Sequence, residues 1–380
     1  MRIAVATIGR FHVLDLAREL SALGNEVAFW SIVPQSRAER FGLPAETHRN
    51  LLSRLFPLVA AHRYGGQRLR KWANSALLHA TDRLVARRLE PCDVFIGMSG
   101  LCVESARVAR ERYGAKVLIE RGSRHVLSQK AILDCLVQRG FPVDTVPEYI
   151  IERELDGYAI ADRIVIPSHH VAQSFMEQGV PVEKLFRNAY GADLSMFQPT
   201  LALTDRPPTI LFVGTWSYRK GVDLLVTAWR RLKGVKLLHV GAAGDAPLPD
   251  MEGFEHVNPV PQWRLREYYA RAHLFVLASR EEGLSLVQVQ ALACGLPVIC
   301  TDRTGGEDLQ EKLFDKERVT VVPHDSADAL VDGIRKGLAR AARMNGIRDG
   351  LGAARNRFTW RAYAERYHEF LNGTCRSKQL

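Results

Sequence analysis

Short apolar runs alternate with segments of helical periodicity along most of this 380-residue chain, and this alternation constrains the fold more than any other feature. Residues 2–9 (RIAVATIG) predict a buried strand. Val13, Leu16 and Leu20 then recur at helical spacing, and a glycine follows the helix. Strands that alternate with helices form a parallel sheet covered by helices on both faces. The sequence therefore predicts an α/β fold built from doubly wound parallel sheets.

Two such alternating sets are separated by residues 188–210, which are rich in Gly, Asp, Thr and Pro and suit a connection between domains. A chain of this length is comfortable as two domains of roughly 150–200 residues each. We expect an N-terminal domain over residues 1–192, a second domain over residues 193–355, and a terminal helix within residues 356–380 that packs back on the first domain. The cleft between two such domains, outside the carboxyl ends of the strands, is the expected active site.

The same pattern places the remaining elements. Residues 35–90 are mostly helical, with a loop around residues 64–66. Further strands are predicted, in chain order, at residues 26–33, 93–100, 115–123, 161–168, 209–214, 235–241, 274–279 and 296–302.

Composition excludes several classes of protein. No apolar run approaches the roughly 20 residues of a transmembrane helix, and the first residues do not read as a signal peptide. The six cysteines form no CxxC pair and fit no zinc template, so we expect reduced, structural thiols. The sequence therefore predicts a cytoplasmic protein.

The formal charge of +10 is densest in residues 51–100, which hold eight Lys or Arg against three Asp or Glu. No helix-turn-helix, RNP or zinc-finger signature is present, so nucleic acid is disfavoured as a partner. A basic, partly amphipathic region of this kind suits an anionic membrane surface, at the inner face of the cell membrane. A solvated helix face explains the same pattern, and both interpretations stay open.

The second domain offers a candidate phosphate site. A strand ends at Gly214, where a ligand can approach the backbone closely, and a loop leads through Thr215 to Arg219 and Lys220 before the next helix. Two adjacent cations neutralise a diphosphate well, Arg through its fork and Lys as a point charge.

The segment from Arg280 to Pro297 is more specific. A strand ends at Ser279, two carboxylates follow at Glu281 and Glu282, and a turn of small residues opens a helix. The free N–H groups at the start of that helix favour an anion. A sugar held between carboxylate and phosphate explains why Glu282 lies beside a diphosphate; the alternative is a carboxylate that only complements the helix dipole.

These residues resemble a known family. EEGLSLVQVQALACGLPVI resembles the donor-binding signature of glycosyltransferase family 4, E-G-F-G-L-x-x-x-E-A-M-A-x-G-x-P-V-I, and LFVGTWSYRKG resembles the V-G-R-x-x-x-x-K-G segment of that family. ADRIVIPSHHVAQSF, NAYGADLSMFQP and YYARAHLFVLAS match further segments in order. The resemblance implies a GT-B architecture, with two Rossmann-like domains facing a cleft. It also implies a retaining transfer of a sugar from a nucleoside diphosphate without a bound metal.

The resemblance assigns roles by position. Glu282 would contact the donor sugar, Lys220 the diphosphate, and Arg219 would replace the family arginine, whose place Thr215 takes. Gln290 stands where the family has a second glutamate, and its amide keeps an acceptor for the ribose while adding donors. The donor site would be completed by the strand end, the turn and the helix start, at Gly214, Gly283, Leu284, Ser285, Leu286 and Val287.

In the first domain the family often carries a histidine after a strand, in a pattern like T-x-H-G. Here Arg121 takes that place, and His125 follows four residues later. We expect His125 to face the cleft as the acceptor-side catalytic residue, with Glu120 and Arg121 behind it, alongside Glu282, Lys220 and Arg219. Gly9, Arg10 and His12, at the first strand–helix turn, face the same cleft and suit an anionic or hydroxyl-rich acceptor; a plain surface role is equally compatible.

The resulting hypothesis is a retaining hexosyltransferase acting on a glycan or lipid-linked acceptor, in synthesis of cell-envelope polysaccharide or glycolipid. A sugar-nucleotide epimerase or a phosphorylase would use the same fold. A non-catalytic partner subunit that binds a sugar nucleotide would also explain Thr215, Gln290 and the missing histidine. A dehydrogenase is disfavoured, because no G-x-G-x-x-G follows the first strand.

Overall fold

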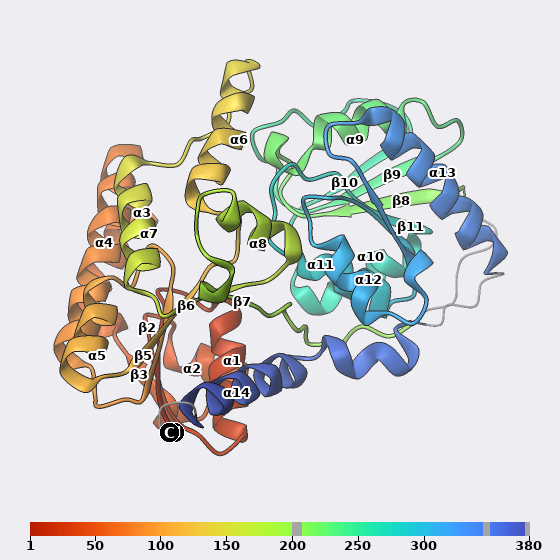
Figure 1. Ribbon diagram of the computed structural model, residues 1–380. Helices are drawn as coiled ribbons and strands as arrows, with labels where there is room; N and C mark the ends of the chain where they lie inside the picture. The colour runs from red at the N-terminus through yellow and green to blue at the C-terminus, as the bar shows by residue number, and fades with distance from the viewer. Residues whose placement is uncertain (200–206, 345–349, 377–380) are drawn as a thin grey trace.

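A computed structural model describes residues 1–199, 207–344 and 350–376, and shows two α/β units side by side (Figure 1). Part of the predicted connection, residues 200–206, lies outside the described residues. Each unit is built on one parallel sheet with helices on both faces, which confirms the predicted fold class.

The first sheet has seven strands in the order β3-β2-β1-β4-β5-β6-β7, all parallel. Its strands are β1 (Arg2–Ala6), β2 (Glu26–Ser31), β3 (His48–Asn50), β4 (Val94–Met98), β5 (Lys116–Glu120), β6 (Arg163–Ile166) and β7 (Leu185–Arg187).

The second sheet has six parallel strands in the order β10-β9-β8-β11-β12-β13. They are β8 (Thr209–Val213), β9 (Lys236–Val240), β10 (Phe254–Val257), β11 (Leu274–Leu277), β12 (Val298–Thr301) and β13 (Val319–Val322).

The helices of the first unit are α1 (Phe11–Ala22), α2 (Gln35–Arg40), α3 (Leu52–Tyr64), α4 (Gln67–Arg88), α5 (Glu104–Tyr113), α6 (Val126–Gln138), α7 (Glu148–Ile160) and α8 (His169–Met176). Those that follow are α9 (Val222–Trp229), α10 (Leu265–Arg271), α11 (Leu286–Ala293), α12 (Gly306–Lys312), α13 (Ala327–Arg343) and α14 (Trp360–Arg376). Short 3₁₀ turns connect them; one, η3 (Tyr218–Lys220), matters for the site.

Strand β1 shows how the apolar run at the N-terminus serves two cores. Ile3 and Val5 point to one face of the sheet and belong to the same cluster as α1 and the second unit. Ala4 and Ala6 point to the other face, toward the cluster that includes α4, α5 and α8. Side chains of a strand alternate between its faces, so a strand buried on both faces must be apolar throughout.

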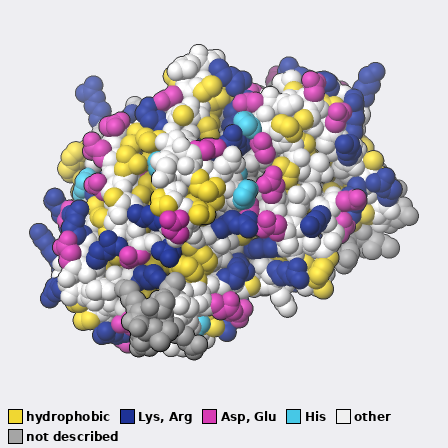
Figure 2. Space-filling view, in the orientation of Figure 1, with side chains coloured by type: hydrophobic (Ala, Val, Ile, Leu, Met, Phe, Trp, Pro, Cys, Tyr) yellow, Lys and Arg dark blue, Asp and Glu magenta, His cyan; other side chains and the backbone are white. Residues whose placement is uncertain are grey.

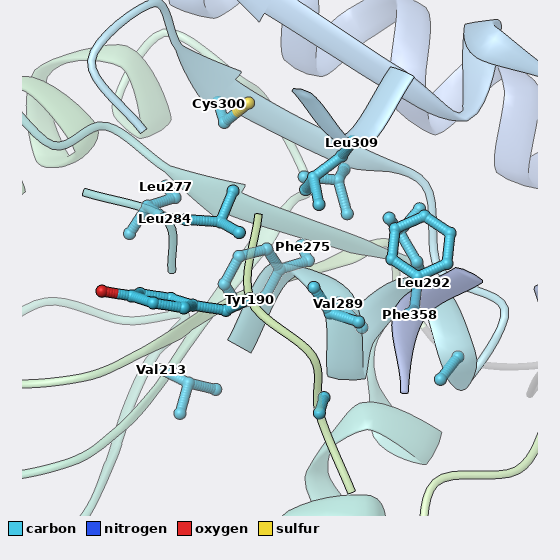
Figure 3. Close-up of a cluster of buried hydrophobic side chains, with 14 of the residues drawn as sticks. Tyr190, Val213, Phe275, Leu277, Leu284, Val289, Leu292, Cys300, Leu309 and Phe358 are labelled. Atoms are coloured by element: carbon cyan, nitrogen blue, oxygen red, sulfur yellow. The ribbon is translucent and has the colours of Figure 1, made fainter. Parts of the chain in front are cut away.

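The larger cluster continues from the first unit into the second. Figure 3 shows its second-unit part, where Phe275, Leu277 and Val289 pack beside Tyr190 of the connection and Phe358 near the C-terminus. The two units are therefore joined by shared apolar packing as well as by the chain.

Helix α14 returns from the second unit and lies along α1 of the first (Figure 1). The hydroxyl of Tyr363 donates to Glu120 Oε1 at 3.0 Å, and Asn188 Nδ2 donates to the carbonyl of Tyr363 at 3.1 Å. The C-terminal helix thus ties the end of strand β5 to the end of the chain.

The hydrogen bond between Tyr363 and Glu120 predicts that Tyr363→Phe lowers the free energy of unfolding. The change removes a hydrogen bond to a fully buried carboxyl group, and we expect a loss of about 1.5–3 kcal/mol in the free energy of unfolding. Urea denaturation measures it. The matched change Tyr64→Phe, at a side chain 79% exposed, should stay within about 0.5 kcal/mol of the native protein. Equal effects of the two changes would contradict the role of the Tyr363 hydroxyl.

Candidate active site between the two units

The carboxyl ends of both sheets meet where the units contact each other. Gly283, after β11, lies so close to the first unit that a Cβ there would overlap the carbonyl oxygen of Gly122. Ser168 Oγ donates to the carbonyl of Gly283 at 2.9 Å, and His170 Nε2 lies 2.7 Å from the carbonyl of Glu282. The segment that carries the two sequence-predicted carboxylates is thus held from both units.

The turn after β8 brings the two predicted cations to the same place. Gly221 has φ 67°, in the left-handed region that favours glycine, and a Cβ there would overlap the carbonyl oxygen of Ala278. Glycine therefore lets η3 pack directly on the end of β11. Arg219 and Lys220 sit on this turn, and Arg280 N donates to the carbonyl of Arg219 at 3.0 Å.

Each cation meets one carboxylate. Arg219 Nη1 lies 2.9 Å from Glu281 Oε2, and Lys220 Nζ pairs with Glu282 Oε2. Glu281 is fully buried, whereas the side chain of Glu282 keeps part of its surface. Two ion pairs therefore lie side by side between η3 and the turn that follows β11.

Arg280 holds this arrangement in place from behind. Its buried guanidinium bonds Asp223 at 2.7 and 2.8 Å and Asp325 at 2.6 Å, and it donates to the carbonyl of Tyr218 at 2.6 Å. A forked guanidinium with several acceptors is a rigid anchor. Arg280 therefore fixes η3 relative to β11.

Helix α11 begins beside these charges. Ser285 occupies its N-cap position, but the side chain makes no capping hydrogen bond. The leading N–H groups, around Leu286 and Val287, are thus left for another acceptor, and the helix dipole adds positive potential there. Gln290 is buried on this helix and accepts a hydrogen bond from the hydroxyl of Tyr269 at 3.1 Å.

A cavity of about 240 Å³ joins the two units at the start of α11. On the first unit it is lined by the residues after β1, and on the second by the start of α11. Its lining includes Arg10, Phe11, His12, Gln262, Leu286, Gln290 and Trp360. The structure thus brings three sequence-predicted groups together: Arg10 and His12 from the acceptor side, and the helix start with Gln290 from the donor side.

The acceptor-side residues are held by named contacts. Arg10 Nη2 lies 3.5 Å from Asp15 Oδ2, and its guanidinium carbon lies 3.5 Å from the ring centre of Phe41. His12 Nε2 lies 3.0 Å from Glu120 Oε2. Phe11 between them has φ 31°, which is strained for a residue with a side chain, and 54% of it is exposed.

The expected placement of His125 is wrong. Its ring is buried between Tyr158 and Phe175, with ring centres 5.0 and 4.9 Å away, and Nδ1 accepts from the N–H of Leu127 at 3.3 Å as the N-cap of α6. Burial, with Arg121 nearby, lowers the pKa of His125 to about 4. The histidine therefore starts a helix in the interior and does not face the cleft.

Glu120 and Arg121 are interior groups as well. Glu120 is fully buried and bonds His12 and Tyr363. Arg121 Nη1 donates to Glu154 Oε1 at 2.6 Å and Nη2 to Gln129 Oε1 at 2.8 Å. Both residues therefore bond other side chains rather than facing the cleft as expected.

Around Glu281, sequence reasoning missed Ser123 and Gln129. Their partner is Glu281, more than 150 positions away in the chain. No local pattern marks such a pair, because only the docking of the units brings them together.

Within the described residues, no three His, Cys, Asp or Glu side chains gather closely enough to hold a metal ion. A metal-independent reaction stays a prediction. Nor is any helix in the described ranges both long and apolar enough to span a bilayer.

Comparison with known proteins gives a family match for the second unit. The family described as glycosyl transferases group 1 matches residues 207–340, which contain η3, β11 and α11. The second unit is a group 1 glycosyl transferase domain. This confirms, for the matched residues, the resemblance drawn from the sequence.

Relatives of this glycosyl transferase domain share low identity with the chain. D-inositol 3-phosphate glycosyltransferase from Xylanimonas cellulosilytica is 29% identical over 53% of this chain and 54% of its own length. A GDP-mannose-dependent alpha-(1-6)-phosphatidylinositol monomannoside mannosyltransferase from Mycolicibacterium smegmatis is 28% identical over 58% of this chain and 64% of its own. The chain thus spans about half to two thirds of the length of these relatives.

A solved structure confirms the whole fold. Sucrose-phosphate synthase from Thermosynechococcus elongatus superimposes with a TM-score of 0.69, covering 99% of this chain and 100% of the other, at 20% identity. The two-unit GT-B architecture therefore extends over the glycosyl transferase domain and the N-terminal unit together.

The corrected position of His125 generates a prediction about acid stability. The imidazole stays neutral in the folded protein down to about pH 4 but takes a proton near pH 6.5 when unfolded. The native state therefore loses stability as pH falls from about 6.5 to about 4. His125→Asn keeps an N-cap residue but lacks this titration, so its stability should fall by about 2 kcal/mol less than that of the native protein between pH 7 and pH 4.5.

Urea denaturation at the two pH values measures this difference. Asn fills less of the space between Tyr158 and Phe175, so the variant starts less stable at pH 7, and the gap between the two proteins should narrow on acidification. A gap that stays constant would mean that the His125 ring is not buried as a neutral cap.

Proposed function

We propose that this chain is a retaining glycosyltransferase that moves a hexose-type sugar from a nucleoside-diphosphate sugar to a hydroxyl of a glycan or lipid-linked acceptor. The observation that carries the proposal is that Arg219 pairs with Glu281 and Lys220 with Glu282, just before the uncapped start of α11. Two cations and free N–H groups suit a diphosphate, and a carboxylate beside them suits sugar hydroxyls.

In the proposed reaction, negative charge develops on the diphosphate next to the positive groups of the site. The bond from the anomeric carbon to the diphosphate oxygen breaks, and negative charge builds on the leaving diphosphate. Arg219, Lys220 and the N–H groups near Leu286 stabilise that charge, and such preorganised stabilisation is commonly the largest catalytic contribution. Glu282 accepts hydrogen bonds from the donor sugar and so orients it.

The acceptor enters from the first unit. Its hydroxyl oxygen forms the new bond to the anomeric carbon on the face that the diphosphate leaves, and its proton passes to a diphosphate oxygen. The cavity lined by Arg10, Phe11 and His12 opens beside the start of α11 and suits a hydroxyl-rich or anionic acceptor. The buried cap His125 takes no part in this scheme. The names of the relatives, one a GDP-mannose-dependent enzyme of a phosphatidylinositol mannoside, support a nucleotide-sugar donor.

A thermal-shift screen against UDP-, GDP-, dTDP- and ADP-sugars tests donor binding. A donor present at about 100 times its Kd stabilises the fold by about 2.7 kcal/mol, which is a clear shift in melting temperature. Stabilisation by one nucleotide class supports the proposal and names the donor. No shift with any of the four classes would contradict it.

Lys220→Ala tests the diphosphate site directly. Removing one of the groups that stabilise the leaving group should lower turnover of the donor found in the screen by about 100-fold or more. Lys233→Ala, an exposed lysine of the same domain, is the matched control and should retain native turnover. Near-native turnover of Lys220→Ala, measured as released nucleoside diphosphate, would remove the basis of the assignment.

We further propose that the first unit rests on an anionic membrane surface, at the cytoplasmic face of the cell membrane, through α3 and α4. These two helices pack against each other, and residues 51–81 hold five Lys or Arg and no Asp or Glu. Phe56, Tyr64 and Trp72 on them are 61%, 79% and 59% exposed. Exposed aromatic rings among cations suit the interface of an anionic bilayer.

The surface view supports this location. Lys and Arg side chains project from the edge of the molecule formed by α3, α4 and α5 (Figure 2). Among the described residues none of the five cations of residues 51–81 has an ion-pair partner; they are Arg54, Arg63, Arg68, Arg70 and Lys71. Their charge is therefore available to lipid headgroups.

Arg70→Ala/Lys71→Ala tests the membrane surface. Each cation near an anionic bilayer contributes about 1 kcal/mol, so the double change should weaken binding to vesicles containing phosphatidylglycerol by about tenfold or more. Vesicle sedimentation measures the bound fraction. Lys233→Ala/Lys236→Ala, at two exposed lysines of the second unit, removes the same charge outside this surface and should bind like the native protein. Equal binding by both variants would contradict the proposed surface.

A further inference from the structure

A fully buried carboxylate, Glu281, bridges the two units beside the proposed diphosphate site. From the second unit, Arg219 Nη1 donates to Oε2 at 2.9 Å. From the first unit, Gln129 Nε2 donates to the same oxygen at 3.3 Å, and Ser123 Oγ donates to Oε1. Both carboxylate oxygens therefore receive hydrogen bonds from the N-terminal unit, and one of them also holds Arg219.

The first-unit partners of Glu281 are themselves held by a chain of buried contacts. Gln129 Oε1 accepts from Arg121 at 2.8 Å, and Arg121 donates to Glu154 at 2.6 Å. Glu154 in turn accepts from the hydroxyl of Tyr158 at 2.8 Å. A continuous polar network thus runs from the interior of the N-terminal unit to Arg219. Arg121, in the place of the family histidine, is its central member.

The carboxyl group of Glu281 is charged, so its hydrogen bonds matter more than those of a neutral buried group. Burial raises the pKa of Glu281, but Arg219, with Ser123 and Arg121, outweighs burial and lowers it below the ordinary value. The group is therefore ionised at neutral pH. A buried charge that loses some of its partners is strongly destabilised unless the remaining partner compensates it. Without the first-unit donors, Arg219 would have to satisfy Glu281 by itself.

Arg219 has guanidinium N–H groups beyond those that bond Glu281. In the part of the chain that the structure describes, its side-chain hydrogen bonds all use Nη1, to the carboxylate and carbonyl of Glu281. The rest of the guanidinium, in a side chain 37% exposed, is left for a ligand. A second hydrogen bond to Glu281 would take up donors that a diphosphate needs.

We propose that Glu281 is a positioning residue that couples the contact between the two units to diphosphate binding. Glu281 bonds only one nitrogen of Arg219, because Gln129 and Ser123 of the N-terminal unit donate the other hydrogen bonds that its carboxylate needs. The inference rests on the proposed function, since it assigns Arg219 to the diphosphate. It adds that donor affinity depends on side chains of the opposite unit that do not touch the donor.

A double-mutant cycle between Gln129 and Arg219 tests the coupling. Isothermal titration with UDP, GDP, dTDP and ADP measures nucleotide affinity in the native protein, Gln129→Ala, Arg219→Ala and the double variant. We expect Gln129→Ala to weaken binding of the preferred nucleotide by about fivefold or more. In the Arg219→Ala background the same change should have little further effect, because the group that Glu281 positions is gone.

Two more variants separate positioning from folding. Lys130→Ala is the matched control on α6. The lysine pairs with Asp134 rather than with Glu281, so nucleotide affinity should stay native. Glu281→Gln keeps the size of the side chain, removes its charge and should repeat the loss seen in Gln129→Ala. Urea denaturation of each variant shows whether it folds.

The outcomes distinguish the two proposals. Native nucleotide affinity in Gln129→Ala, or equal losses from that change with and without Arg219, would overturn the coupling while leaving the proposed function intact. Failure of the native protein to bind any of the four nucleotides would contradict the proposed function itself, and the inference with it.

Discussion

The close approach of Gly283 to Gly122 is the constraint on which the site depends. Only a residue without a side chain allows the turn after β11 to lie directly on the backbone after β5. Ser168 and His170 then hold the carbonyls of Gly283 and Glu282. Burial lowers the pKa of His170 to about 3, so its ring is neutral, and Nε2 donates to the carbonyl of Glu282. The carboxylates beside the proposed donor site are therefore fixed by the N-terminal unit as much as by their own domain.

The sequence predicted the central strands well and missed four short ones, β3, β7, β10 and β13. All four are the edge strands of their sheets. A central parallel strand is buried on both faces and must read as an apolar run, as β1 and β8 do. An edge strand is partly exposed, and its three or four residues, such as the Phe254–Val257 segment, form a run too short to stand out as a buried strand. Its position depends on the strand that it pairs with, which no local sequence specifies.

The same distinction explains the site. Arg219, Lys220, Glu282 and the start of α11 lie on two short strand–turn–helix segments, where local rules fix the backbone. Sequence reasoning therefore placed them together correctly. The orientation of His125 depends instead on α7 and α8, whose Tyr158 and Phe175 enclose its ring. A polar residue after a strand reads the same in a sequence whether it caps a helix or faces a ligand, and only packing decides between them.

The charge balance of the site bears on how a donor would enter. Without ligand, Arg219 and Lys220 are each matched by one carboxylate, so neither cation is left as an uncompensated charge in a partly buried place. A diphosphate that binds Lys220 would replace Glu282 as its partner and release that carboxylate toward the sugar hydroxyls. Glu281 has no such freedom, because it is fully buried and bonded from both units. In the proposed function the two adjacent glutamates therefore differ. Glu282 would exchange its partner Lys220 for the ligand, whereas Glu281 would stay bonded to Arg219.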